Sequence, residues 1–304
     1  MTKLVTEALK DLELTPKEKA RSTNMFALGL VYWLYERDIK STVDFLNKKF
    51  KAKPLIASSN IKSMKTGYYY GETIEAIKTT YKVDKAKFDS GTYRNIMGNH
   101  ALSLGLLAAS EKSDLNLFFG GYPITPASDI LKYLANYKNF GVKTFQAEDE
   151  ISAMTSVLGA AFTGKLAVTA SSGPGIALKG EAIGLAVITE LPLVVLNIQR
   201  GGPSTGLPTK TEQSDLFQAM YGRNGECPCV VIAASSPSDC FDTAIEASKI
   251  ALEHMIPVIL LSDGYIANGS EPWKIPDVSK ISNIKTNFID SKTEDFNQYN
   301  HDKN

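Results

Sequence analysis

The segment with the clearest chemical potential starts with an arginine and continues in glycine, proline and hydroxyl residues. It runs from Arg200 to Thr209 and follows the apolar run 191–196. An arginine offers a permanent planar cation, which suits a carboxylate or a phosphate. Because open parallel sheets bind ligands beyond the carboxyl ends of their strands, the segment predicts an anion-binding loop. The alternative is a surface arginine that pairs with an acid.

Two segments upstream also follow apolar runs. Residues 122–126 read Tyr-Pro-Ile-Thr-Pro, and Thr125 has two interpretations. It can cap a helix that starts at Pro126, which the spacing favours, or it can turn its hydroxyl toward a ligand above the sheet.

Residues 146–150 include three consecutive acids. Acids usually stabilise a helix start, but one of them can instead be a buried proton partner with a raised pKa.

A third segment, Ser171 to Gly175, reads Ser-Ser-Gly-Pro-Gly. It is similar to an anion-binding turn before a helix, and its glycines can equally serve close packing of a helix on a strand. It matches neither the GxGxxG fingerprint nor the P-loop, so neither kind of nucleotide site is indicated.

The composition limits the class of protein. The 304 residues are 43% hydrophobic, and 33 Lys and Arg balance 33 Asp and Glu. We therefore expect a large core, and the lack of a basic excess argues against a nucleic-acid partner. No apolar run approaches the ~18 residues of a membrane span. The charged N-terminus has no apolar signal core, so we expect a cytoplasmic protein that does not bind membranes.

The three cysteines are Cys227, Cys229 and Cys240. They form no CxxC pair, and the first two lie too close together for a usual zinc or iron–sulfur site. We expect ordinary thiols in a reducing compartment and no metal bound by this chain.

The pattern of apolar residues divides the chain into three regions. Residues 1–95 favour helices, because apolar residues recur at helical spacing in stretches such as 26–34, while 67–71 interrupts that pattern as a loop. Residues 96–265 alternate short apolar runs with longer helical stretches. Residues 266–304 lose the periodicity, and we interpret them as linker and tail.

The alternation in residues 96–265 predicts an α/β fold, in which a parallel sheet is covered by helices on both faces and preceded by a helical region. The expected strands are 115–119, 142–145, 166–170, 193–198, 229–233 and 257–261. The expected helices are 127–137, 151–163, 176–189 and 239–254.

Four segments, found in order at matched strand ends, resemble one protein family. They are residues 122–126, 146–150, 171–175 and 199–209. They look like the corresponding segments in alpha subunits of 2-oxoacid:ferredoxin (acceptor) oxidoreductases, and the arginine loop is most similar to the 2-oxoglutarate branch. The resemblance covers about residues 90–265, which in this family form the pyrimidine-binding domain of a thiamine diphosphate site. Residues 20–50 resemble the last part of the gamma domain that many relatives fuse ahead of alpha.

The resemblance implies a reaction and a set of partners. The reaction is oxidative decarboxylation of a 2-oxoacid, such as 2-oxoglutarate or pyruvate, to its acyl-coenzyme A, with electrons passing to ferredoxin. The cofactor is shared with a beta subunit, to which the diphosphate, its Mg²⁺ and an iron–sulfur cluster belong. A hetero-oligomer is therefore implied.

The resemblance also implies roles for individual residues. Glu148 matches the glutamate that bonds the aminopyrimidine ring, so it is the implied catalytic residue. The positions that match substrate-binding residues are Tyr122, Thr125, Arg200 and Thr209. The further implied cofactor contacts are Pro123, Ile124, Ser172 and Gly173.

Three departures from the family pattern stand out. The family's Gly-Asn-Glu-Ala is Gly-Asn-His-Ala at 98–101, which puts His100 in place of an acid. The gamma domain looks truncated, and the domain that usually follows the first alpha domain looks absent.

Two other functions stay open: a non-catalytic interaction subunit of such a complex, and a nucleotide-binding α/β protein that uses residues 171–175 for phosphate.

Overall fold

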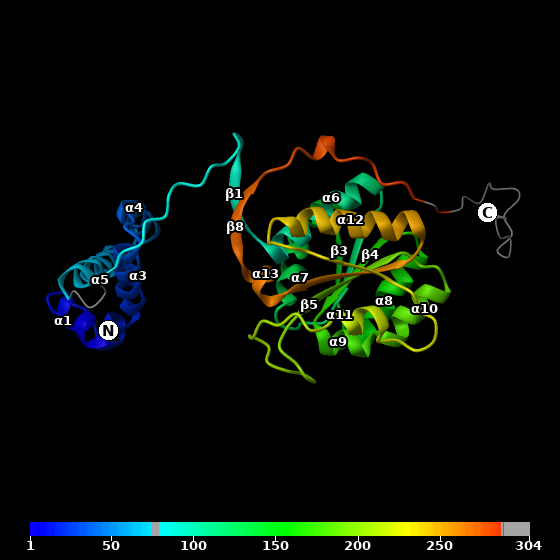
Figure 1. The fold of residues 1–304 in the computed structure, drawn as a ribbon, viewed down its shortest axis with the longest axis horizontal. Helices are drawn as coiled ribbons and strands as arrows, with labels where there is room; N and C mark the ends of the chain where they lie inside the picture. The colour runs from blue at the N-terminus through cyan, green and yellow to red at the C-terminus, as the bar shows by residue number, and fades with distance from the viewer. Residues whose placement is uncertain (75–78, 287, 289–304) are drawn as a thin grey trace, which may run out of the picture. The chain divides into compact units, whose positions relative to one another are not determined.

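The computed structural model describes residues 1–74, 79–286 and 288. The chain divides into two compact units, Met1–Asp89 and Ser90–Asn304. Figure 1 shows a helical unit at the N-terminal end of the chain and a sheet covered by helices in the second unit. Each unit is described by itself.

The first unit consists of helices. They are α1 (Thr2–Ala8), α2 (Pro16–Arg21), α3 (Thr23–Leu34), α4 (Lys40–Lys49) and α5 (Pro54–Thr73). A capping box starts α2, where Thr15 accepts a hydrogen bond from the backbone of Glu18 and the Glu18 side chain accepts one from the backbone of Thr15. A small core of Val5, Leu9 and Phe26 holds α1 against the helix pair α3 and α5.

Glycines set the close approach of α3 and α5. A Cβ atom on Gly29 would overlap the Met64 carbonyl, and one on Gly67 would overlap the Phe26 carbonyl. The loop predicted at 67–71 is therefore wrong, because these residues lie inside α5. The glycines allow the two helix backbones to come close together. They therefore do not mark the end of a helix here, as glycine often does.

The second unit is built on a six-stranded parallel sheet with the order β3-β2-β4-β5-β7-β6. Its strands are β2 (Leu117–Gly121), β3 (Lys143–Gln146), β4 (Leu166–Ser171), β5 (Leu193–Gln199), β6 (Val230–Ala233) and β7 (Pro257–Asp263). β4, β5 and β7 are buried along their whole length. This explains their continuous apolar sequence, and all six predicted strands are confirmed.

Helices cover both faces of the sheet. They are α6 (Gly98–Ser113), α7 (Ser128–Ala135), α8 (Glu150–Phe162), α9 (Gly173–Leu178), α10 (Gly180–Ile188), α11 (Leu216–Tyr221), α12 (Asp239–His254) and α13 (Gly264–Asn268). Short 3₁₀ turns occur at Lys138–Phe140 and Val278–Lys280. The helix predicted at 176–189 is divided between α9 and α10, and α6 was not predicted as a helix.

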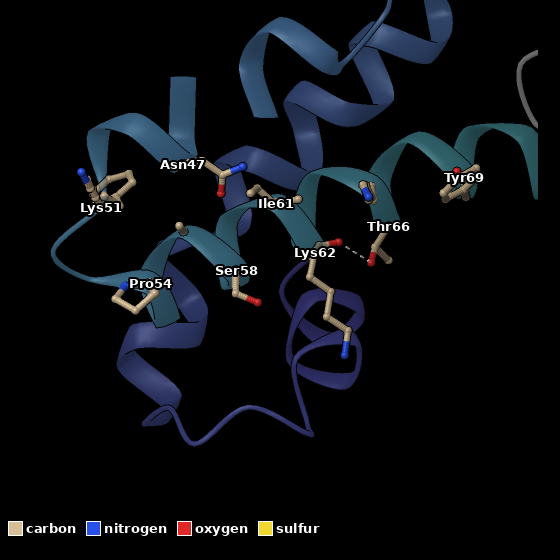
Figure 2. Close-up of a pocket in the computed structure, with 11 residues that line it drawn as sticks. Asn47, Lys51, Pro54, Ser58, Ile61, Lys62, Thr66 and Tyr69 are labelled. Carbon is tan, nitrogen blue, oxygen red and sulfur yellow. Dashed lines mark hydrogen bonds between the residues drawn. The ribbon is translucent and has the colours of Figure 1, made fainter. Parts of the chain in front are cut away.

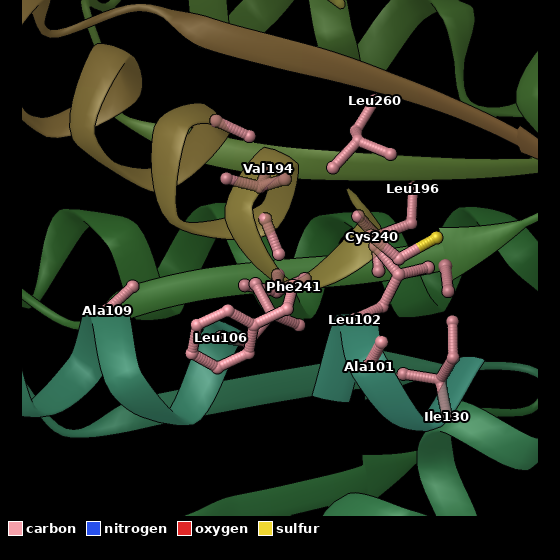
Figure 3. Close-up of a cluster of buried hydrophobic side chains, with 14 of the residues drawn as sticks. Ala101, Leu102, Leu106, Ala109, Ile130, Val194, Leu196, Cys240, Phe241 and Leu260 are labelled. Carbon is pink, nitrogen blue, oxygen red and sulfur yellow. The ribbon is translucent and has the colours of Figure 1, made fainter. Parts of the chain in front are cut away.

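The core lies in two layers, one on each side of the sheet. α6, α7 and α12 pack on one face, where Leu106, Phe241 and Leu260 are among the buried side chains (Figure 3). α8, α9 and α10 pack on the other face, around side chains such as Met154 and Val195. Alternate residues of β4 and β5 serve the two layers, as the period of a strand requires.

The expected linker contains a strand. β8 (Ser270–Lys274) pairs antiparallel with β1 (Tyr93–Met97), which leads into α6. The linker interpretation is wrong for this stretch, because a two-stranded ribbon has no continuous apolar run and its partner lies far away in sequence. Trp273 of β8 is buried and packs against Phe241 of α12. The polar end of the expected tail, residues 292–304, lies outside the described residues.

Candidate functional site

The parallel sheet brings the four predicted segments to one edge. The pairs Gly121 with Gln146, Gly121 with Ala170, and Ser171 with Asn197 lie opposite each other in neighbouring strands. The loops that follow β2, β3, β4 and β5 therefore leave the sheet side by side. The carboxyl edge of an open parallel sheet is the usual ligand site of such folds.

Arg200 connects two of these loops. It follows β5, is 8% exposed, and its Nη1 donates a hydrogen bond of 2.7 Å to the Thr125 carbonyl. Nη2 donates to the Thr205 carbonyl in the arginine's own loop. Nε is buried and has no partner among the described residues. The alternative of a surface arginine paired with an acid is therefore wrong for the described part of the chain.

The arginine loop itself has an ordered backbone. Gly201 forms a bridge with Leu207, and the Gly202 amide donates to a Glu212 carboxylate oxygen at 2.8 Å. Further along, Gln213 donates to Asp263 at 2.6 Å, which ties the loop to the end of β7. The loop is held at both ends, so Arg200 is pre-positioned. Thr209 is exposed and makes no described hydrogen bond to Arg200 or Thr125.

Thr125 is not a helix cap, so the capping interpretation is wrong. The α7 helix begins at Ser128 and its N-cap position is Ala127. The chain first makes a turn, in which the Ile124 carbonyl accepts from both the backbone and the hydroxyl of Ser128. Thr125 is exposed in this turn and Tyr122 is 38% exposed, so both side chains are accessible from solvent.

Asn99 supports the same turn and was not singled out by the sequence. It is fully buried at the start of α6, and its Nδ2 donates to the Pro126 carbonyl at 2.8 Å. Its neighbour His100 stacks on Tyr133 of α7 with ring centroids 4.3 Å apart. Burial, with a smaller effect of Arg94, lowers the pKa of His100.

The acidic segment after β3 separates into two roles. Asp149 caps α8, since its side chain accepts from the Ser152 amide at 2.7 Å, and Glu150 lies in the first turn. Glu148 is exposed and makes no hydrogen bond in the described part of the chain. Stabilisation of the helix start therefore explains Asp149 and Glu150. It does not explain Glu148, whose carboxylate has no hydrogen-bond partner among the described residues. Glu148 is not buried within this chain.

The Ser171–Gly175 turn is buried and polar. The hydroxyls of Ser171 and Ser172 have no partner among the described residues. A Cβ atom on Gly173 would lie 2.7 Å from a carboxylate oxygen of Asp215, so glycine is needed for close packing. Asp215 also accepts from Asn197 at 3.0 Å. Burial raises its pKa, which the Asn197 bond opposes.

A cavity of about 510 Å³ lies between this turn and the arginine loop. Its lining residues are Gly173, Pro174, Ala177, Arg200, Gly202, Pro203, Ser204, Glu212, Ser214, Asp215 and Gln218. The cavity therefore joins two segments that the sequence identified separately. It offers the space beside Arg200 that a small anion would need.

Lys179 is a second residue that the sequence did not reveal. It is fully buried behind the Ser171–Gly175 turn, and its Nζ donates to the Thr169 hydroxyl at 2.6 Å. Burial lowers the pKa of Lys179 to about 7, while the negative charge of Glu150 acts in the opposite direction. Buried titratable groups with shifted pKa values are concentrated at functional sites.

The first unit carries a different kind of pocket. A groove of about 650 Å³ runs along α4 and α5, with lysines at its rim and apolar side chains such as Ile61 between them (Figure 2). Lys62 already pairs with Asp11 at 3.1 Å, and the Thr66 hydroxyl donates to the Lys62 carbonyl. All the residues that line the groove belong to the first unit.

Within the described ranges, no three or more His, Cys, Asp and Glu side chains are grouped to hold a metal ion. The described helices include none with the length and apolar character needed to cross a membrane.

Comparison with known proteins identifies a cofactor-binding family that covers the loops at the carboxyl edge of the sheet. Residues 113–303 match the family described as pyruvate flavodoxin/ferredoxin oxidoreductase, thiamine diphosphate-binding. The chain belongs to this family. The α/β fold predicted from the sequence is confirmed, and the helical region precedes it as expected.

Individual relatives give the same assignment. The chain is 54% identical over its full length to the 2-oxoglutarate oxidoreductase subunit KorA of Mycobacterium tuberculosis, and covers 46% of that protein. It is 41% identical over 201 residues to the 2-oxoglutarate synthase subunit KorA of Archaeoglobus fulgidus, which is 65% of this chain and 57% of that protein. The chain thus spans about half the length of these relatives.

A solved structure has a similar fold. It is the 2-oxoglutarate:ferredoxin oxidoreductase from Magnetococcus marinus with 2-oxoglutarate, coenzyme A and succinyl-CoA bound. The TM-score is 0.80 at 32% sequence identity, and the match covers 95% of this chain and 49% of that one. The predicted resemblance to this enzyme family is therefore confirmed.

Proposed function

We propose that this chain is part of an alpha subunit of a 2-oxoacid:ferredoxin oxidoreductase, with 2-oxoglutarate as the preferred substrate class. The named relatives act on 2-oxoglutarate, and they support this choice. The observation that carries the proposal is the exposed, uncommitted Glu148 carboxylate at the same sheet edge as the Arg200–Thr125 contact. A cofactor-binding acid and a substrate-binding cation then lie at the same edge of the sheet, after two strands (β3 and β5) that are separated by β2 and β4.

The residues at this edge fit the pyrimidine part of thiamine diphosphate. Glu148 offers a carboxylate for a ring nitrogen, and the buried Ser172 hydroxyl beside Gly173 has no partner among the described residues. Pro123 and Ile124 offer apolar contacts. The edge has no diphosphate-binding motif, so the fit is to one half of the cofactor only.

When bound, the cofactor supplies a nucleophilic carbon and an electron sink for decarboxylation. Glu148 holds a proton at the pyrimidine ring nitrogen and so favours the ring form that can accept the proton of the reactive carbon. Arg200 binds the carboxylate of the 2-oxoacid. Its guanidinium has five N–H donors, of which the described bonds to carbonyls use two. The hydroxyls of Tyr122, Thr125 and Thr209 complete the substrate contacts.

The proposal requires a partner subunit. Glu148 is exposed within this chain, whereas a cofactor-activating acid acts best away from water. Apolar side chains in the segments that follow the carboxyl ends of β5 and β7 are also exposed, with Leu207, Phe217 and Tyr265 at 58%, 74% and 74%. We propose that a beta subunit with the diphosphate, Mg²⁺ and iron–sulfur sites covers them. Coenzyme A would accept the acyl group and ferredoxin the electrons.

Three further assignments follow from the same proposal. The unit Met1–Asp89 is the end of a gamma domain, the following unit contains the pyrimidine-binding domain, and the enzyme is a cytoplasmic hetero-oligomer. The helical character of the first unit supports the first of these. Its helices pack on each other through α3 and α5, as in a domain with its own core.

The proposal is tested by purifying the tagged chain together with the proteins encoded beside it. We expect a complex that reduces a viologen dye in the presence of a 2-oxoacid, with an absolute requirement for thiamine diphosphate. A panel of 2-oxoglutarate, pyruvate and branched 2-oxoacids then identifies the substrate. A stable complex with no activity on any of them would support a non-catalytic subunit and contradict the proposal.

A further inference from the structure

Lys179 is buried in a way that is unusual for a lysine. It lies at the junction of α9 and α10, has no solvent-exposed surface, and is the only lysine in the described part of the chain that is buried. The ammonium group has three donors, and the one described hydrogen bond is the 2.6 Å bond to Thr169. A group of this kind needs an explanation, because lysine is almost never fully buried unless it is paired.

The position of Lys179 places it directly behind the Ser171–Gly175 turn. Its backbone amide donates to the Gly175 carbonyl at 3.1 Å. Thr169 lies two residues before Ser171 in β4, so both side chains point to the same face of the sheet. The lysine therefore holds the strand that enters the turn and the helix that leaves it.

The start of α8 meets the same turn. A Cβ atom on Gly175 would lie 2.9 Å from Cγ of Glu150, and it would overlap the Ser171 hydroxyl. Glu150 comes two residues after Glu148. The negative charge of Glu150 also acts on Lys179, although no ion pair between them lies within 4.0 Å. The turn and the end of the acidic segment are thus packed against each other.

Stability of the fold does not explain the lysine. A buried ammonium group loses its hydration, and apolar residues of similar volume are often as stabilising as a buried charge or more so. Methionine has nearly the same length and would suit the same layer of the core, which contains apolar residues such as Ile183. The free-energy cost of burying Lys179 is therefore better explained by the geometry of the site in front of it.

We infer that Lys179 is a positioning residue of the thiamine diphosphate site. Together with Thr169 it fixes the Ser171–Gly175 turn against the start of α8, and so sets the spacing between Ser172–Gly173 and Glu148. These two groups come from different strands and share no described hydrogen bond. The inference rests on the proposed function, since it assigns Lys179 to the cofactor of that same site.

The test uses the complete complex with its partner subunit, freed of cofactor. The variant is the pair Thr169→Val and Lys179→Met, because removal of both partners leaves neither end of their hydrogen bond buried without a partner. Lys165→Met is the matched control, since Lys165 lies just before the first residue of the same strand, away from the turn. Binding of thiamine diphosphate with Mg²⁺ is measured by calorimetry, and the melting temperature of the cofactor-free complex is measured in parallel.

We expect the double variant to bind the cofactor about tenfold more weakly, as for outer-shell partners of other sites. Its melting temperature should stay the same or rise, and Lys165→Met should change neither quantity. Wild-type affinity in the double variant would overturn the inference and leave the proposed function standing. A melting temperature lowered by more than about 5 °C would show a merely structural role and also overturn it. Failure of the wild-type complex to bind the cofactor would instead overturn the proposed function, and the inference with it.

Discussion

The guanidinium of Arg200 donates a hydrogen bond of 2.7 Å to the main-chain carbonyl of Thr125, across 75 residues of sequence. The bond joins the loop after β5 to the loop after β2. Two segments that the sequence selected for separate reasons are therefore parts of one site. The contact also orients the turn on which Tyr122 and Thr125 are exposed, so Arg200 holds two loops together in addition to its proposed role as the substrate-binding cation.

Replacement of Arg200 by lysine should weaken substrate binding. A lysine keeps the charge but cannot donate in a fork to two carbonyls and a carboxylate. We expect the KM for the 2-oxoacid to rise about 10- to 100-fold, which corresponds to the loss of one or two charge-assisted hydrogen bonds. Steady-state kinetics of the complex would measure it.

Arg223 provides the control for this experiment. It also donates to main-chain carbonyls, those of Ala219, Met220 and Cys227, but it lies outside the strand-end site. Arg223→Lys should leave the KM unchanged. Equal effects of the two substitutions would show that the Arg200 effect comes from loop stability alone.

Asn99→Ala should disturb the site from behind. The variant removes the donor that holds the Pro126 carbonyl and leaves that carbonyl without its described partner. We expect a loss of about 1–3 kcal/mol in the free energy of unfolding and a higher KM for the 2-oxoacid. Denaturant titration and kinetics would show whether both change together, and an unchanged KM in a destabilised variant would separate Asn99 from the site.

Replacement by alanine should have opposite effects at a glycine in the α3–α5 contact and at a glycine with open space around it. Gly67→Ala should destabilise the helical unit by about 1–3 kcal/mol, because the new methyl group would overlap the Phe26 carbonyl. Gly159→Ala in α8 meets no atom within 4 Å and should stabilise by up to about 1 kcal/mol. Thermal unfolding of both variants would decide, and stabilisation by Gly67→Ala would refute the close contact.

Lys179 should make the stability depend on pH in the alkaline range. Burial lowers its pKa from 10.5 to about 7 in the folded chain. Between these values the unfolded chain binds more protons than the folded chain, so the free energy of unfolding rises with pH. The stability of the wild type relative to the double variant Thr169→Val with Lys179→Met should increase on the order of 3 kcal/mol from pH 7 to pH 10. A pH-independent difference would mean that Lys179 stays charged in the folded chain.

Much of the sheet could be predicted because buried parallel strands are continuous apolar runs between turn residues. β1 and β8 were not predicted, since each is a short, half-exposed strand whose only partner in the ribbon is distant in sequence. The helix pair of the first unit was obscured by Gly67 and Gly71, which signal a loop in sequence but serve helix contact in space.

The site was predictable where residue type and strand end coincide, as for Arg200. Thr125 was misjudged as a cap because the turn that delays α7 depends on the Ile124 carbonyl and its two bonds from Ser128. Lys179 and Asn99 could not be found, because a lysine in a helix is usually exposed and a buried asparagine has no sequence signal. Only tertiary contacts reveal such residues.

In the proposed reaction the Glu148 carboxylate activates the cofactor, and a comparison of two glutamate variants tests this role most directly. The complex with Glu148→Gln is assayed for thiamine diphosphate-dependent oxidation of the 2-oxoacid beside Glu246→Gln, an exposed glutamate on α12 in the other layer. We expect kcat to fall at least about 100-fold in Glu148→Gln, as for loss of a general acid–base group, and to stay at the wild-type value in Glu246→Gln. Wild-type turnover in Glu148→Gln would contradict the account.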